Sequence, residues 1–210
     1  MEYKDVYEAI SKYYYIEENI NAEGDDSYSA ARRIPTEMID NKLHKNIVQW
    51  QQIVKEIQIT FPNLLSVYHG NDHVDTCYTI VLFIAKKEIE NVTFTQELFC
   101  HFSLLADFFC IYGKDSIQLI DKGLKSDFDP IITISPKNIY EEYFSKLLLM
   151  IKKTMPHYRF LAFVFLKQRI VGLRIFSTFL KDNQYSSVYQ ALFTPENLTD
   201  YKKRGNILFE

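Results

Sequence analysis

The sequence predicts an α+β protein, with N-terminal helices packed on a mostly antiparallel sheet and a further helix near residues 136–154. Apolar residues recur at helical spacing up to Pro62, whereas beyond it the chain consists of β-branched and aromatic runs separated by turn residues. No linker or internal repeat divides the chain. We therefore expect a single domain over residues 1–210, helical over 1–62 and rich in sheet over 63–210.

Two helices are expected before Pro62. In residues 3–20, tyrosine, valine and isoleucine recur at spacings near three and four, which predicts an amphipathic helix with an aromatic-rich buried stripe. Thr36 has the side chain of an N-cap for a second helix, in which apolar residues repeat at similar spacings from Ile39 to Ile57. This second pattern is the strongest helical signal in the chain.

The runs beyond Pro62 predict an antiparallel meander. The expected strands are 64–68, 77–85, 93–105, 108–112, 116–120 and 131–134. The run 93–105 also suits a helix. Gly113, within residues 112–115, is predicted to form a hairpin turn, because glycine adopts positive φ without steric cost.

A third helix is expected after the meander. Ser135 is its predicted N-cap and Pro136 its first helical residue, and Met155-Pro156 ends it. Segments 160–166 and 170–176 are then predicted as two strands around a turn, although residues 160–180 also fit one buried helix.

Composition excludes several classes of protein. The chain is 47% hydrophobic and 24% charged, so it can bury a large core and is neither disordered nor collagen-like. Its first residues lack a signal-peptide pattern, and no apolar stretch approaches the roughly 20 residues of a spanning helix. We therefore expect a cytoplasmic protein without a membrane segment. The three cysteines have no Cys-x-x-Cys spacing and lie among apolar neighbours, which predicts buried free thiols.

Charge is distributed unevenly along the chain. The net charge is −3, but residues 1–130 carry 21 acidic and 12 basic side chains, whereas residues 131–210 carry 6 acidic and 12 basic ones. The acidic part could meet a basic partner, or its charges could interleave with basic ones on a solvated surface once the chain folds. Among its carboxylates are Asp115, Asp121, Asp127 and Asp129.

No motif predicts a catalytic residue, a metal ion or a cofactor. The segment His69–Asp75 holds two histidines and two aspartates, but it lacks the His-Glu-x-x-His spacing and also fits an ordinary polar loop between strands. Cys100 and His101 are neighbours on an expected strand, so their side chains point to opposite faces. The short basic cluster Lys202–Arg204, in a chain of pI near 6.0, does not predict a nucleic-acid partner.

Three consecutive tyrosines, Tyr13 to Tyr15, cannot all lie on one buried stripe of a helix. At least one ring is expected to face outward, where it would suit a protein interface; alternatively, the rings bridge core and solvent through their hydroxyls. Acidic residues follow them closely. The candidate partner-binding residues are Tyr13, Tyr14, Glu17, Glu18, Asp25 and Asp26.

The C-terminal third of the chain resembles a known class of protein. The stretch consists of the expected strand and helix Ile132–Lys153, then Met155–Arg159 and Gly172–Ile175, then Val188–Phe193 followed by Arg204–Phe209. In the order and composition of these elements it resembles the immunity proteins of bacterial polymorphic-toxin and contact- or secretion-dependent systems. The resemblance implies a cytoplasmic α+β antitoxin that acts in bacterial competition without catalysis, but it transfers no functional residue.

The sequence leads to two expectations of function, of which the resemblance supports the first. The first is an immunity protein that binds a cognate antibacterial toxin and occludes its active surface, with the candidate residues meeting a basic patch on the toxin. The second is a small-ligand-binding protein or enzyme with a pocket near His69–Asp75. The sequence does not indicate the oligomeric state.

Overall fold

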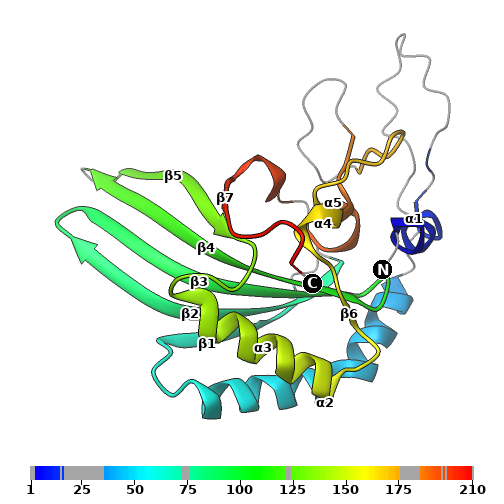
Figure 1. Cartoon of the computed structure of the whole chain (residues 1–210), viewed down its shortest axis with the longest axis horizontal. Helices are drawn as coiled ribbons and strands as arrows, with labels where there is room; N and C mark the ends of the chain where they lie inside the picture. Colours follow the sequence, from blue (N-terminus) through cyan, green and yellow to red (C-terminus); the bar gives the residue numbers. More distant parts are fainter. Residues whose placement is uncertain are drawn as a thin grey trace, which may run out of the picture.

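The computed structural model describes residues 3–14, 16, 36–71, 76–121, 124–175, 185–194, 196 and 198–209. These residues form a seven-stranded sheet between two helical layers (Figure 1). The predicted α+β fold with a mostly antiparallel sheet is confirmed. No helix within these ranges is long and apolar enough to cross a bilayer.

The strands are β1 (Ser66–Gly70), β2 (Cys77–Ile89), β3 (Val92–Ser103), β4 (Phe108–Asp121), β5 (Leu124–Thr133), β6 (Arg159–Phe160) and β7 (Lys202–Arg204). The first five form an antiparallel meander in chain order. Two short strands join it in parallel, β6 beside β4 and β7 beside β5. The predicted antiparallel meander is confirmed, and the run 93–105 forms strand β3, but the predicted strands 108–112 and 116–120 are parts of the single strand β4.

The helices are α1 (Tyr3–Ser11), α2 (Thr36–Thr60), α3 (Tyr140–Thr154), α4 (Phe163–Leu166) and α5 (Val188–Leu192), with a 3₁₀ helix, η1 (Leu198–Asp200). One face of the sheet is covered by α2 and α3, and the other by α1, α4 and α5 (Figure 1). The predicted helix that begins at Thr36 is confirmed as α2.

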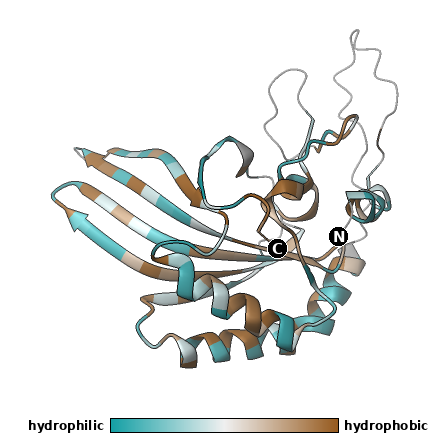
Figure 2. Ribbon diagram, viewed as in Figure 1, coloured by the Kyte–Doolittle hydropathy of each residue, from teal (hydrophilic) through white to brown (hydrophobic). Residues whose placement is uncertain are grey.

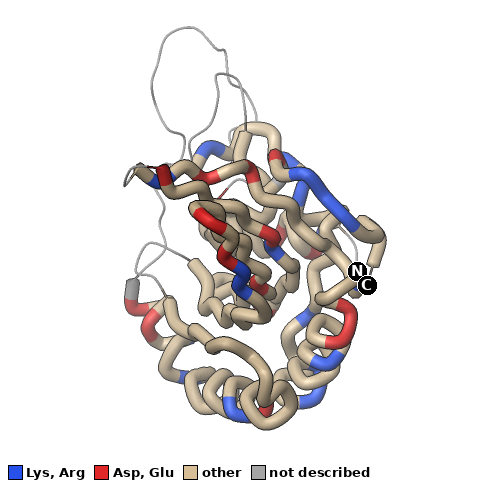
Figure 3. Tube along the Cα trace, turned by 90° about the vertical axis from the view of Figure 1, so that its left-hand side faces the viewer, with Lys and Arg blue, Asp and Glu red and all other residues tan. Residues whose placement is uncertain are grey.

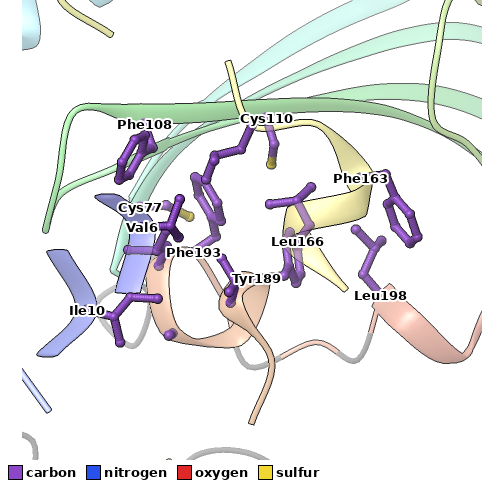
Figure 4. Packing of buried hydrophobic residues seen from close by; sticks show 14 of the residues in the cluster. Val6, Ile10, Cys77, Phe108, Cys110, Phe163, Leu166, Tyr189, Phe193 and Leu198 are labelled. Carbon is purple, nitrogen blue, oxygen red and sulfur yellow. The ribbon is translucent and has the colours of Figure 1, made fainter. Parts of the chain in front are cut away.

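Each face of the sheet has its own hydrophobic core. Under α2 and α3, the fully buried Trp50 stacks on Tyr78 of β2 with 4.2 Å between ring centroids. On the opposite face, Val6 of α1 and Phe193, which follows α5, pack over Cys110 of β4 (Figure 4). The cysteines of the chain are buried and free, as predicted.

The predicted hairpin turn at residues 112–115 is wrong. Gly113 lies inside β4, where it pairs with Thr133 of β5. A Cβ atom on Gly113 would lie 2.7 Å from ring carbons of Tyr140, so the glycine makes room for an aromatic ring that packs flat on the strand. Glycine is typical of turns, but at this position close packing against Tyr140 explains it.

The predicted start of the third helix is also wrong. Helix α3 begins at Tyr140 after the N-cap Ile139, which makes no side-chain cap. The Ser135 hydroxyl instead accepts a hydrogen bond from the Asn206 backbone N–H at 2.9 Å, and so fixes the chain just after β7. The predicted end at Met155 is correct, since Met155 is the C-cap.

Neither the two strands nor the single buried helix predicted from Phe160 onward describes the chain beyond Phe160. Only Arg159 and Phe160 form a strand, and the single helical turn α4 follows. Residues 170–175 form no strand, and residues 176–184 lie outside the described ranges. The later helix α5 begins with a capping box, in which the side chains of Ser187 and Gln190 each bind the other's backbone N–H.

Candidate functional site

The four long strands β2 to β5 extend beyond the helices that cover the rest of the sheet (Figure 1). β1 pairs with β2 only as far as Phe83, and β7 pairs with β5 only from Ile131 to Thr133. Both edges of the extending part are therefore without a strand partner among the described residues. We call this part, the described residues of 85–97 and 114–130, the tip.

Residues that face each other in an antiparallel ladder lie on the same face of the sheet. The register of β2 to β5 therefore defines rows that cross the tip. One row consists of Lys87, Phe94, Ile117 and Phe128, and the next row outward consists of Ile89, Val92, Leu119 and Ser126. We call the apolar members, Ile89, Val92, Phe94, Ile117, Leu119 and Phe128, the tip face. Hydrophobic and hydrophilic residues alternate along these extending strands (Figure 2).

The tip face continues the face of the sheet that α2 and α3 cover. Along β3, side chains alternate between faces, so Phe94 lies on the same side as the fully buried Leu98. Beyond the helices, however, the apolar side chains face solvent: Phe94 and Ile117 are each 36% exposed, and Phe128 is 54% exposed. An apolar layer thus runs from the core onto an uncovered surface.

The opposite face of the tip is mostly polar, although Ile120 is exposed on it. It presents Thr93, Thr95, Ser116 and Gln118 around a hollow of about 400 Å³. The tip is therefore an amphipathic sheet, and its polar face is the one suited to solvent. The apolar side chains of the tip face are unfavourable in water, so this face is the stronger candidate for a contact surface.

A hollow of about 360 Å³ lies at the base of the tip face, with Ala85, Phe94 and Ile117 among its lining residues. Asp115 forms its inner wall and accepts three hydrogen bonds. The donors are Arg204 Nη1 at 2.6 Å, Tyr140 Oη at 2.7 Å and Gln96 Nε2 at 3.1 Å. Burial and the hydrogen bond to Asp115 raise the pKa of Tyr140, so this phenol remains a donor and the wall is well ordered.

Acidic residues lie along the strands and turns of the tip, as the view onto its end shows (Figure 3). We call the carboxylates of Glu88, Glu90, Asp121, Asp127 and Asp129 the rim. Two of them, Glu88 and Asp127, are on the polar face, since they pair with Thr93 and Gln118. Glu88 pairs with Lys86 at 2.6 Å. Within the described ranges, the other rim carboxylates form no salt bridge; they are Glu90, Asp121, Asp127 and Asp129. The rim can therefore attract a basic partner, and it includes three of the aspartates noted in the sequence.

A second polar group of residues is buried on the other side of the sheet. His101 of β3 is fully enclosed; its Nδ1 lies 2.8 Å from Thr79 Oγ1 and its Nε2 lies 3.2 Å from Tyr112 Oη. Tyr112 Oη is 3.2 Å from Tyr189 Oη of α5. Burial is the main reason that the pKa of His101 is lowered to about 4. The charge of Glu196 raises this pKa and the charge of Lys114 lowers it, both to a smaller extent. These hydrogen bonds fasten α5 to the sheet.

The structure places the predicted tyrosines against the core. Tyr14 is only 5% exposed, and its hydroxyl donates to the Ala191 carbonyl at 2.9 Å. Tyr13 is half-buried and packs against the same core. The buried Tyr14 therefore presents no ring to a partner, whereas Tyr13 keeps part of its surface exposed and its role stays a prediction. The acidic candidates lie outside the described residues, so their role stays a prediction; they are Glu17, Glu18, Asp25 and Asp26.

The His69–Asp75 segment is described only in part. The side chain of His69 contacts β2, with its Nδ1 2.7 Å from Tyr78 Oη, whereas residues 72–75 lie outside the described ranges. In the described part of the chain, no three His, Cys, Asp or Glu residues gather where they could hold a metal ion. The two hollows of the tip are lined by other residues, so they do not represent the pocket expected near this segment.

Comparison with known proteins identifies no relative. No family model matches the sequence, and no significant match is found among curated proteins or solved structures. The function must therefore be argued from the surface of this chain itself.

Substituting Gly113→Ala is expected to lower the free energy of unfolding by about 1–3 kcal/mol, because the new methyl group would overlap the Tyr140 ring. Urea unfolding followed by the fluorescence of the single tryptophan measures this. Gly70→Ala is the matched control, since there the nearest atom is the Tyr68 hydroxyl, at 3.0 Å on the end of a side chain. Equal losses for the two variants would show that the Tyr140 contact does not require glycine.

Proposed function

We propose that this protein binds a partner protein through the tip face, and that the partner is an antibacterial toxin whose active surface it covers. The observation that carries the proposal is the uncovered apolar face of an extending, amphipathic sheet. Large contiguous apolar surfaces are uncommon on monomers and are typical of interaction sites. The resemblance of the C-terminal third to immunity proteins supports a toxin as the partner and the cytoplasm as the place of action.

The proposed mechanism is steric and electrostatic. Apolar side chains of the tip face, Phe94 and Phe128 above all, supply most of the binding free energy. The carboxylate rim accelerates association with a basic toxin surface. Because the tip extends beyond the helices, it can reach into a concave site that a flat surface could not enter.

The test is to produce this chain together with the protein encoded by the adjacent gene and to measure growth of the host and binding by calorimetry. The double substitution Phe94→Ser and Phe128→Ser is expected to weaken binding at least tenfold, or about 1.4 kcal/mol, and to abolish protection of growth. The matched control is Val48→Ser with Leu149→Ser, two residues that are each 67% exposed on the outer sides of α2 and α3.

Two results would contradict the proposal. If the tip and control variants bind alike, the tip face is not the contact surface. If the wild-type chain binds a partner without affecting growth in its presence, toxin neutralisation is excluded and only partner binding stands.

The acidic candidates of the N-terminal region supply a separate prediction. Reversing Glu17 and Glu18 to lysine is expected to slow association and reduce its dependence on salt, because like charges would then oppose a basic partner. Stopped-flow association rates at several salt concentrations measure the effect. Unchanged rates would remove these residues from the interface and leave the tip face unaffected.

A further inference from the structure

Building on the proposed function, we propose that the hollow of the tip face holds one large apolar side chain of the partner, flanked by a cationic group that pairs with Asp129 and an anionic group that pairs with Lys87. The hollow has a volume of about 360 Å³, which lies within the range of specific binding sites. It is open to solvent at the uncovered end of the sheet, where a partner can reach it.

The shape of the hollow follows from the side chains of two neighbouring rows. Phe94 and Ile117 are direct partners in the ladder and form a raised apolar side. In the adjacent row, Ala85 ends in a methyl group and leaves space beside them. A partner side chain that fills this space gains apolar contact on several sides.

The inner wall is ordered before any partner arrives. Asp115 already accepts hydrogen bonds from Arg204, Tyr140 and Gln96, so its carboxylate is satisfied. Binding an apolar side chain against this wall leaves no polar atom of Asp115 unpaired. A preformed site of this kind binds without the free-energy cost of reorganising its own side chains.

Two further charged residues that line the hollow lie on opposite sides of it and so favour one orientation of a bound partner segment. Asp115 and Arg204 neutralise each other, whereas Lys87 and Asp129 line the hollow without a salt bridge to any described residue. Lys87 belongs to β2 and Asp129 to β5, so three strand spacings, roughly 14 Å, separate their positions. A partner segment with an apolar side chain between one acidic and one basic side chain therefore fits in a single orientation, with its acidic group at Lys87 and its basic group at Asp129.

The probe is the blocked peptide Glu-Ser-Phe-Ser-Arg. In extended form its first, third and fifth side chains share one side, and its charges lie roughly 13 Å apart. We expect this peptide, titrated into the ¹⁵N-labelled full chain, to shift the amide signals of residues 94–96 and 115–117. The same peptide with Gly in place of Phe should cause no shift, and Glu-Ser-Phe-Ser-Glu should bind at least threefold more weakly.

Variants of the chain test the charge pattern. Asp129→Lys is expected to weaken binding of the peptide at least threefold, and the added exchange Lys87→Glu should restore it, because the peptide then binds turned end for end. Asp127→Lys is the matched control: it changes the charge equally on the same strand but lines the polar hollow instead. Ala85→Leu should remove binding by filling the space, without any change of charge.

The proposal is overturned if the glycine peptide shifts the same signals, if the shifts lie outside the tip, or if Asp127→Lys acts as strongly as Asp129→Lys. The whole partner then separates this proposal from the broader one. Binding that is lost with the Phe94 and Phe128 substitutions but unchanged by Ala85→Leu and Asp129→Lys would reject the anchor site and leave the tip face as the interface. If the substitutions at Phe94, Phe128, Ala85 and Asp129 all left binding of the partner unchanged, both the anchor site and the tip face as the interface would be rejected.

Discussion

Lowering the pH from 7 to 4 is expected to reduce the free energy of unfolding by about 3 kcal/mol through His101 alone. The pKa of this histidine falls from 6.5 to about 4 in the folded protein, because burial disfavours the imidazolium. Below pH 6.5 the unfolded chain binds a proton that the folded protein does not, so stability is complete above that pH. It decreases as the pH falls, and the loss levels off near pH 4.

Urea unfolding at a series of pH values, followed by tryptophan fluorescence, measures this effect. Carboxylates also contribute to acid unfolding, so the informative quantity is the difference between wild type and His101→Gln. We expect that difference to shrink as the pH falls from 7 to 4. His44→Gln, on the exposed side of α2, controls for the loss of a histidine. A difference that is constant with pH would mean that His101 takes up a proton as readily in the folded protein as in the unfolded chain.

Trp50→Ala is expected to lower the free energy of unfolding by about 3–5 kcal/mol. Trp50 is fully buried, stacks on Tyr78 and lies 6.0 Å from the Phe102 ring, so its removal leaves a cavity between α2 and the sheet. Urea unfolding followed by circular dichroism measures the loss, since this variant has no tryptophan.

Trp50→Phe separates ring packing from hydrogen bonding. The Trp50 Nε1–H is buried without a hydrogen-bond partner among the described residues, so replacing the indole by a phenyl ring breaks no hydrogen bond. We therefore expect a loss below about 2 kcal/mol, from volume alone. If Trp50→Phe and Trp50→Ala were equally destabilising, the Nε1–H would have a partner that stabilises the folded state.

The sequence predicted the order of the main elements because their signals are local. The spacing of apolar residues in α2 and the β-branched runs of β2 and β3 can be read within short windows. The errors arose where a residue serves a distant contact. Gly113 and Ser135 have the residue types of a turn and a cap, but each is explained by packing or hydrogen bonding to a segment far along the chain.

The tip face was only partly predictable. The charge pattern singled out Asp127 and Asp129, and the alternation of apolar and polar residues in β3 and β4 was visible. The turn predicted at Gly113, however, divides the continuous strand β4 into two expected strands, so the sequence did not indicate the long strands that form the tip. Which part of the sheet the helices leave uncovered depends on tertiary packing, which no local pattern encodes. The contacts of His101 were equally inaccessible, since Tyr189 lies 88 residues away.

The parallel pairing of β7 with β5 affects how the protein emerges from the ribosome. Ile131 of β5 pairs with Lys202 of β7, so about 70 further residues are synthesised after β5 before β7 can pair with it. At typical rates of synthesis this interval lasts roughly 4–14 s. During translation the nascent meander therefore exposes the edge of β5 at residues 131–133, which β7 covers in the finished molecule, and chaperones that recognise unpaired strands have time to act on it.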